Sequence, residues 1–404
     1  MYVGGFAMVA TSTPVYGGEH VAKMGVIVVS IAYRVGPLGF LTHPELTADS
    51  PRKISGNYGL LDQIAALQWV QRNIKAFGGD PGRVTIFGES AGGISVSMLA
   101  ASPLGKGLFQ RAICQSGGSF APIRRANETE GMQRLADAES KGVEFAKRMG
   151  ANSLAELRHV SPDKWRRDPA AQMGGFWPIV DGCVIVDDQY KLYEAGKYND
   201  VPVLIGTNSD EGSMFARPTS PELYEKNLRE RFGSFAEKIL GLYPGKTQDQ
   251  TFRGAADLFR DVVFGWPTWT WARLQSKTGT APVFVYYFEQ KQPVSLLSLL
   301  LKSDGASHGS EIVYVFRHLD QNQASQPTDD DRKLSERMAA YWTNFAKQGN
   351  PNADALPQWP VYNDREPTVL YLQSNPHVGP VPNRDKLAVI DEYQAWKRAS
   401  GDRL

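Results

Sequence analysis

The apolar positions of the chain fall into two kinds of pattern. Short runs rich in apolar and β-branched residues are typical of strands, and the first of them, GVIVVSIAYR, is apolar enough for a strand buried on both faces. These runs cover residues 25–34, 83–88, 109–118, 201–207 and 281–289. Helical segments are predicted over residues 58–82, 89–102 and 329–349. Strands that alternate with helices predict an α/β fold with a mostly parallel central sheet flanked by helices.

Composition limits the kinds of protein that this chain can be. Of its 404 residues, 42% are hydrophobic and 22% are charged, so a sizeable core is possible. We expect residues 1–404 to form one large domain. The formal net charge is +1, from 44 basic and 43 acidic residues, which argues against a charge-driven role on nucleic acid or a membrane surface. No apolar run approaches the ~20 residues needed to span a bilayer.

The stretch GESAG at residues 88–92 carries the first candidate chemistry. It lies between a predicted strand and a predicted helix, and a serine on such a sharp turn presents its hydroxyl from a strained backbone that flanking glycines permit. The next amide, on Ala91, lies at a helix N-terminus and can donate a hydrogen bond to an oxyanion. Ser90 is therefore a candidate nucleophile. The alternative is an ordinary glycine-rich turn.

A serine nucleophile needs a base, and the chain has six histidines. In this architecture the acid and then the base follow the nucleophile along the chain. His308, in the loop DGASHGSE after a late strand, fits that order, and its small neighbours leave the ring accessible. Three other histidines lie in charged or proline-rich segments and are expected at the surface. They are His159, His318 and His377.

The acid that orients the base should follow an earlier strand. VPVLIGTNSDEG places Asp210 and Glu211 just past a strand end, where ligands bind in open α/β sheets. Spacing alone does not choose between these two carboxylates, and either could instead stabilise the loop.

Together these motifs resemble those of the type-B carboxylesterases, the cholinesterase-like branch of the α/β-hydrolase fold. The resemblance runs essentially from end to end. Residues 57–93, NYGLLDQIAALQWVQRNIKAFGGDPGRVTIFGESAGG, resemble the signature block of that family, and GWPTWTWAR and LPQWPVY resemble segments of its bacterial members. The resemblance implies the α/β-hydrolase fold and hydrolysis of carboxylic esters without a metal or an organic cofactor.

The resemblance also implies roles for individual residues. In the family's G-x-N-x-D-E-G segment the glutamate completes the triad, so the acid falls on Glu211, the nucleophile on Ser90 and the base on His308. Glu89 matches an acidic position that lines the pocket, and a buried, hydrogen-bonded turn residue is the alternative. Two positions match residues that support the hydrogen bonding of the site. They are Ser116 and Glu311.

The first residues resemble the end of the family's oxyanion loop, H/Y-G-G-G-F. Aligned on Phe6, Gly4 and Gly5 keep the positions of the amide donors, and Val3 replaces the first glycine. The family carries early strands, including a central one, before this loop. We therefore expect the N-terminal strands of the sheet to be missing, through either a start assigned too late or a truncation that folds poorly.

The sequence thus predicts a serine ester hydrolase that forms an acyl-enzyme. His308 takes the proton of Ser90 as the oxygen attacks the ester, and Glu211 orients the imidazole. The oxyanion donors are the amides of Gly4, Gly5 and Ala91. The alternative is an inactive truncated fragment or a non-catalytic binding or adhesion protein on the same scaffold.

The expected partners are a small-molecule ester and water, with no nucleic acid and no membrane span. The specific ester, the localisation and the oligomeric state do not follow from the sequence. Some tryptophans could line a substrate pocket or belong to the core. They are Trp177, Trp266 and Trp269.

Overall fold

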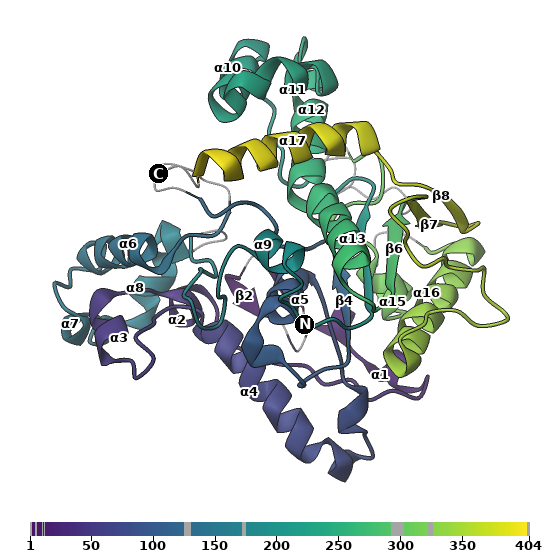
Figure 1. Cartoon of the computed structure of the whole chain (residues 1–404), viewed down its shortest axis with the longest axis horizontal. Helices are drawn as coiled ribbons and strands as arrows, with labels where there is room; N and C mark the ends of the chain where they lie inside the picture. The colour runs from purple at the N-terminus through teal and green to yellow at the C-terminus, as the bar shows by residue number, and fades with distance from the viewer. Residues whose placement is uncertain are drawn as a thin grey trace.

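The centre of the computed structural model is an eight-stranded sheet with the order β2-β1-β3-β4-β5-β6-β7-β8 (Figure 1). Neighbouring strands are parallel from β1 to β7, and the edge pairs β1–β2 and β7–β8 are antiparallel. The structure describes the backbone except at Met1, Gly5, Ala10, Ser12, 125–130, 172–174, 292–302, 322–325 and 402–404. The strands are β1 (Tyr2–Gly4), β2 (Met8–Val9), β3 (Thr85–Ser90), β4 (Arg111–Gln115), β5 (Val203–Asn208), β6 (Val283–Phe288), β7 (Thr368–Leu372) and β8 (His377–Pro380).

Helices cover both faces of the sheet (Figure 1). The α-helices are α1 (Glu19–Ala22), α2 (Gly36–Phe40), α3 (Pro44–Asp49), α4 (Tyr58–Asn73), α5 (Ala91–Ala101), α6 (Leu135–Arg148), α7 (Leu154–Arg158), α8 (Pro162–Arg167), α9 (Gln189–Glu194), α10 (Pro221–Phe232), α11 (Ala236–Leu242), α12 (Gln248–Arg260), α13 (Trp266–Thr278), α15 (Ile312–Val315), α16 (Asp329–Gln348) and α17 (Arg384–Gly401). The 3₁₀ turns are η1 (Pro14–Tyr16), η2 (Ile74–Phe77), η3 (Pro81–Arg83), η4 (Pro103–Gly105), η5 (Pro169–Ala171), η6 (Gly233–Phe235) and η8 (Leu319–Gln321), and η7 (Asp261–Gly265) is a π-helix.

Side chains alternate between two hydrophobic cores, one on each face of the sheet. On β5, Val203 and Ile205 pack in the larger core with residues of α4, α5, α13 and α17, whereas Leu204 packs in the smaller core with residues of α15 and α16. β6 divides in the same way, with Val283 in the larger core and Phe284 in the smaller. Because both faces are covered, these strands are apolar on both sides, as predicted.

Most predicted elements are present near their expected positions. The predicted helix over 58–82 is α4 followed by η2, which ends at Gly78 in the left-handed region with φ of 81°. The predicted helix over 329–349 is α16. A capping box of Thr328 and Asp331 closes its N-terminus, and Gly349 ends it with φ of 76°. The predicted mostly parallel α/β fold is confirmed.

The predicted strand over 25–34 is wrong. Residues 26–35 pair with no strand in the part of the chain that the structure describes, and Ile27 and Val29 are 46% and 39% exposed. A strand exists only through hydrogen bonds to a neighbour, and an apolar composition cannot supply that neighbour. Tyr33, near the end of this segment, is nevertheless buried in the larger core.

A loop, and no strand, is predicted from the sequence where β1 and β2 form. β1 pairs with the carboxyl end of β3, and β2 pairs back onto β1. Strands of three and two residues are too short to show a period in the sequence, so only their tertiary pairing reveals them. On this side of β3 the described sheet continues with β1 and β2.

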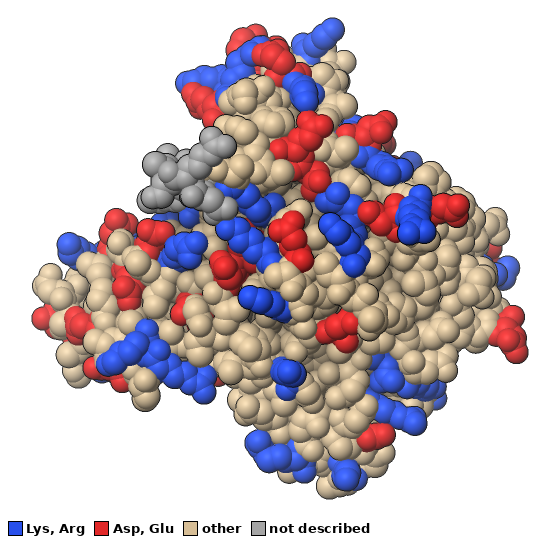
Figure 2. Space-filling view, viewed as in Figure 1, with Lys and Arg blue, Asp and Glu red and all other residues tan. Residues whose placement is uncertain are grey.

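Charged residues of both signs are interspersed over the face shown in Figure 2. Among the described residues, none of the helices combines the length and the apolar character that a membrane crossing requires.

Candidate active site

Ser90 lies at the turn between β3 and α5. Its φ of 55° and ψ of −125° are unusual for a residue with a side chain, and such a conformation costs roughly 1–3 kcal/mol that the surrounding fold must offset. A turn of this kind presents the serine hydroxyl at the carboxyl edge of the sheet. The sharp strand-to-helix turn predicted at Ser90 is therefore present.

Helix α5 approaches the sheet closely because its first turn contains glycine. A Cβ added to Gly93 would lie 2.7 Å from the backbone oxygen of Gln115. A Cβ added to Gly117 would lie 2.6 Å from the backbone carbon of Gly93, so the two glycines face each other. This packing fixes the N-terminus of α5, and with it the amide of Ala91, beside the end of β3.

His308 contacts a carboxylate at each ring nitrogen. Nδ1 lies 2.5 Å from Glu211 Oε2, and Nε2 lies 3.2 Å from Glu89 Oε1. The His308 side chain is only 9% exposed. Ser90 directly follows Glu89 in the chain, but the hydroxyl makes no hydrogen bond to the imidazole in this structure. The structure thus joins the candidate base to Glu211 and brings Glu89 to the nitrogen that a serine proton would reach.

The second oxygen of Glu211 is also occupied. Oε1 accepts hydrogen bonds from the backbone amide of Asn208, at 2.7 Å, and from the hydroxyl of Ser116. Glu211 is fully buried, so these donors offset the cost of burying the carboxylate and fix its orientation.

Glu311 lies behind Glu211 in a buried hydrogen-bond network. Its carboxylate accepts hydrogen bonds from Gln115 Nε2 (2.9 Å) and Asn208 Nδ2 (2.5 Å). Trp342 Nε1 donates to Gln115 Oε1 at 3.0 Å. Three members of this network were not predicted from the sequence. Gln115 lies in the QSGG motif beside Ser116, and Asn208 lies in the GTNSDEG motif close to Glu211, so their closeness in sequence to predicted site residues could have indicated them. Trp342 lies on α16, where nothing in the neighbouring sequence indicates a role in the site.

Burial and neighbouring charges shift several pKa values in this cluster. Burial raises the pKa of Glu89 to about 8, and His308 partly opposes the rise. Burial by itself lowers the pKa of His308, but the three nearby glutamates outweigh it and raise that pKa to about 9. Burial also raises the pKa of Glu311. Groups with perturbed pKa values that lie together are typical of catalytic sites.

Aromatic rings pack against the imidazole. Phe264 stacks on His308 with ring centroids 4.7 Å apart, and Phe215 meets it edge-on at 5.3 Å. Phe264 lies in the π-helix η7, a rare conformation that occurs frequently at functional sites. Phe264 was not predicted as a site residue, because nothing in the local sequence distinguishes a π-helix from an α-helix.

Asp210 has different partners from Glu211. Its carboxylate accepts hydrogen bonds from Arg253, Ser213 and Ser303. Burial works against the charged form, but these partners outweigh it and lower the pKa of Asp210 to about 2. Asp210 therefore holds the loop after β5, while Glu211 faces the imidazole.

The candidate oxyanion donors lie on both sides of Ser90. Ala91 is the first residue of α5, so its amide lies at a helix N-terminus. β1 pairs with β3 so that Val3 is level with Ser90, and Gly4 follows Val3 at the same edge of the sheet. Gly5 lies outside the described residues.

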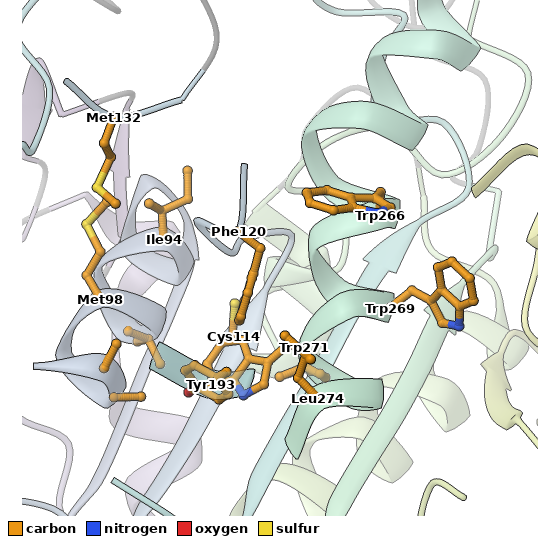
Figure 3. Packing of buried hydrophobic residues seen from close by; sticks show 14 of the residues in the cluster. Ile94, Met98, Cys114, Phe120, Met132, Tyr193, Trp266, Trp269, Trp271 and Leu274 are labelled. Atoms are coloured by element: carbon orange, nitrogen blue, oxygen red, sulfur yellow. The ribbon is translucent and has the colours of Figure 1, made fainter. Parts of the chain in front are cut away.

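Two of the candidate pocket tryptophans belong to the core around α13 (Figure 3). Trp266 is fully buried, and its Nε1 donates to Asp391 at 2.9 Å. Trp269 lines a cavity of about 30 Å³, which is too small for an ester substrate and includes none of the candidate triad residues. Trp177 packs edge-on against Phe6, with centroids 4.7 Å apart.

The histidines expected at the surface have different environments. His159 and His377 are exposed as predicted. His318 is only 2% exposed, and its Nε2 lies 2.8 Å from the backbone oxygen of Gly17, so that prediction is wrong. The two residues are 301 positions apart, and a contact over that separation cannot be seen in the local charge pattern.

Comparison with known proteins gives the family of the chain. The sequence profile of the carboxylesterase family matches residues 1–390. The fumonisin B1 esterase of Sphingopyxis macrogoltabida is 35% identical over 377 residues, which cover 90% of this chain and 67% of that protein. The para-nitrobenzyl esterase of Bacillus subtilis strain 168 is 35% identical over 407 residues, which cover 95% of this chain and 76% of the relative. The cocaine esterase of Homo sapiens is 33% identical over 422 residues, with coverages of 99% and 71%.

Solved structures agree with the sequence comparison. A PNB esterase superposes with a TM-score of 0.77 at 32% identity, covering 96% of this chain and 80% of that one. A thermophilic PNB esterase superposes with a TM-score of 0.77, also at 32% identity, with coverages of 96% and 79%. Both the sequence and the α/β-hydrolase fold thus lead to the same assignment. The chain belongs to the carboxylesterase family of carboxylic ester hydrolases.

Proposed function

We propose that the protein hydrolyses esters through an acyl-enzyme on Ser90, with His308 as the base and Glu211 as the acid that orients it. The observation that carries the proposal is the 2.5 Å contact between His308 Nδ1 and Glu211 Oε2, beside the strained turn at Ser90. A carboxylate at Nδ1 keeps a proton on that nitrogen and leaves Nε2 to accept the proton of a serine hydroxyl.

Acylation begins when Ser90 Oγ attacks the carbonyl carbon and its proton passes to His308 Nε2. The negative charge that forms on the carbonyl oxygen is held by backbone amides, and losing one such donor typically costs about 10²–10³ in rate. The proposed donors are Ala91, Gly4 and Gly5. The imidazolium then protonates the leaving alcohol. Water enters, loses a proton to His308 and releases the acid, so the enzyme returns to its initial state.

Nε2 must change partners during this cycle. It faces Glu89 at 3.2 Å, and catalytic hydrogen bonds that are absent without substrate form when the substrate binds. We propose that Glu89 stabilises the imidazolium after Nε2 has accepted the serine proton, because the carboxylate raises the pKa of His308. Ser116 and Glu311 act through the orientation of Glu211 and do not contact the substrate in this proposal.

The rings beside the imidazole favour an ester with an apolar group next to its carbonyl. Phe215 and Phe264 both contact the His308 ring, so a carbonyl that reacts beside this imidazole would have apolar rings nearby. The relatives named above are esterases of fumonisin B1, para-nitrobenzyl esters and cocaine. We propose an ester with an apolar acyl or alcohol group, for which para-nitrophenyl butyrate is a suitable probe.

The test combines hydrolysis with covalent labelling. The wild-type protein should hydrolyse para-nitrophenyl butyrate, and a fluorophosphonate should label Ser90, as identified by peptide mass spectrometry. Ser90→Ala should lower kcat by at least about 10³-fold and abolish labelling. Ser276→Ala changes an exposed serine on α13 and should change neither.

Two results would separate the alternatives. Hydrolysis that survives in Ser90→Ala at the wild-type rate contradicts the mechanism. A folded wild-type protein that neither hydrolyses the ester nor reacts with the fluorophosphonate indicates a non-catalytic protein or an inactive fragment.

A further inference from the structure

Glu19, His20 and His318 form a cluster that the proposed reaction does not use. Each side chain offers a ligand atom, and the three atoms lie within 4.8 Å of one another. His318 Nε2 is 3.5 Å from Glu19 Oε1, and His20 Nε2 is 3.9 Å from the same oxygen. Ligands at ~2.0–2.2 Å from a tetrahedral Zn²⁺ are about 3.3–3.6 Å apart. The distances from Glu19 Oε1 to the two histidine nitrogens are therefore close to the ligand–ligand distances around one bound ion.

His318 is fixed in place before any ion binds. It is buried, and its ring lies nearly parallel to that of Phe316, with an interplanar angle of 10° and centroids 6.4 Å apart. Phe316 in turn contacts Phe87 of β3 at 6.0 Å. The ring of His20 meets His318 edge-on at 5.1 Å. A ligand whose rotamer is held by packing loses little conformational freedom on binding.

We propose that Glu19, His20 and His318 bind one divalent transition-metal ion, with Zn²⁺ as the best-matched member of the class. Two imidazoles and one carboxylate are a ligand set that Zn²⁺ accepts with a further position open to water, and imidazole also suits Cu²⁺ and Ni²⁺. Mg²⁺ and Ca²⁺ prefer oxygen ligands and should not compete.

Metal binding changes one hydrogen bond of His318. Its Nε2 lies 2.8 Å from Gly17 O, a distance at which the imidazole donates to the carbonyl. Ligation uses the lone pair of Nε2, so the neutral ring carries its proton on Nδ1 in the bound state. The nitrogen–metal bond replaces the hydrogen bond to Gly17, and no net proton is released by this residue.

The ligands come from two distant parts of the chain that lie close together in space. Glu19 and His20 begin α1, whereas His318 follows α15, which starts directly after Glu311 of the candidate active site. Figure 1 shows α1 beside α15 and the lower end of α16. A bound ion therefore ties the N-terminal segment to the element that follows the His308 loop, and this link should stabilise the folded protein.

The test is a titration of tag-free, metal-free protein with Zn²⁺ alone, followed by calorimetry. We expect one saturable site per chain and a rise in the thermal midpoint with added Zn²⁺. His20→Ala should weaken binding by at least about tenfold and abolish the rise. The His20 side chain is 42% exposed, so its removal should leave the metal-free thermal midpoint unchanged. His159→Ala, at an exposed histidine, is the matched control and should bind as the wild type does.

Three outcomes would overturn the proposal. The first is no saturable binding at Zn²⁺ concentrations up to about 100 μM, a range in which even a weak site stabilises the folded state measurably. The second is equal affinity in the wild type and in His20→Ala. The third is binding that is kept in His20→Ala and lost in His308→Ala, which would place the ion at the candidate active site. Because every readout is binding or stability, the result is independent of the proposed esterase mechanism.

Discussion

Asp210 and Glu211 are neighbours in the chain with the same functional group, and their partners give them different roles. Arg253 and two serines hold the Asp210 carboxylate, whereas Glu211 contacts the imidazole of His308. A carboxylate can orient a base only where it reaches the ring, and the turn after β5 points the two side chains to different partners. At the scale of the residue, the environment rather than the residue type decides the chemistry.

Glu211→Gln and Asp210→Asn should therefore differ in their effects. Glu211→Gln should lower kcat by about 10³–10⁴-fold, since an amide no longer stabilises the imidazolium or selects its tautomer. Asp210→Asn should change kcat little and lower stability by about 1–3 kcal/mol, because Arg253 loses a buried partner. Rates with para-nitrophenyl butyrate and thermal midpoints check both. Equal losses of rate in the two variants would contradict the assignment.

The pH dependence follows from the raised pKa of His308. In the proposed mechanism His308 acts as the base when it is neutral, so kcat/KM should rise with pH up to about 9. Glu89→Gln removes the carboxyl group that faces Nε2 and that raises the pKa of His308 when it is ionised, so the rising limb should move to lower pH. The contribution of His308 to the stability of the folded protein changes with pH in the opposite direction. The protonated His308 favours the folded state below pH 6.5, and this contribution is lost as the pH rises through about 9. If the rising limb of the kcat/KM profile lies at the same pH in Glu89→Gln as in the wild type, Glu89 does not act on His308.

Helix α5 is placed by the small residues at its start. Its whole length is buried, and its first turn lies against the end of β4 with no room for a Cβ at Gly93. The position of the helix N-terminus beside Ser90 is thus a packing result. Similarly, the π-helix η7 sets where Phe264 lies on the imidazole. At the scale of the element, close packing and local helix geometry determine which groups meet.

Gly93→Ala should destabilise the protein by about 1–3 kcal/mol and lower kcat, because its Cβ would meet rigid backbone and push α5 away from β4. Gly241→Ala is the matched control on α11. A Cβ there meets nothing within 4 Å, and the substitution should stabilise by about 0.5–1 kcal/mol with unchanged activity. Thermal midpoints and kcat measure both. Similar midpoint shifts in the two variants would contradict the packing argument.

At the scale of the whole molecule, the C-terminal helix α17 packs against α13 and helps to hold the larger core together (Figure 1). Asp391 of α17 accepts hydrogen bonds from Trp266 Nε1 and from Arg273 at 2.7 Å. Trp266 is fully buried, so its N–H has no access to water. One carboxylate therefore satisfies two groups of a helix more than a hundred residues earlier in the chain.

Asp391→Ala should lower stability by about 1–3 kcal/mol, because it leaves the buried indole N–H and Arg273 without this acceptor. Glu392→Ala is the neighbouring control. Its carboxylate pairs with Lys238 at the surface, where such pairs contribute about 0.2–1 kcal/mol. Thermal unfolding should therefore show the larger shift for Asp391→Ala, with kcat of both variants near that of the wild type at 25 °C. A larger shift for Glu392→Ala would contradict this role of Asp391.

The parts of the fold and candidate site that the sequence predicted have local causes. The spacing of apolar residues, the helix caps and the glycines predict α4, α5 and α16 close to their observed positions. The strand-to-helix turn at Ser90 follows from the residues directly around it. The order of the motifs indicated His308, and the family resemblance indicated Glu211. The contacts missed were those between distant segments. The Asn208–Glu311 hydrogen bond joins positions 103 residues apart, and no local pattern records such a pair.

By itself the sequence determined an α/β chain with a serine on a strained turn, because period and turn chemistry are properties of neighbouring residues, and its resemblance to the type-B carboxylesterases indicated the family. Only the tertiary structure decided that residues 26–35 form no strand, that β1 pairs beside Ser90, and that His318 is buried against the N-terminal segment. Strand pairing, burial and the partner of a carboxylate all depend on which distant segment of the chain lies next to the residue in the fold. The packing of the whole chain determines which segments become neighbours.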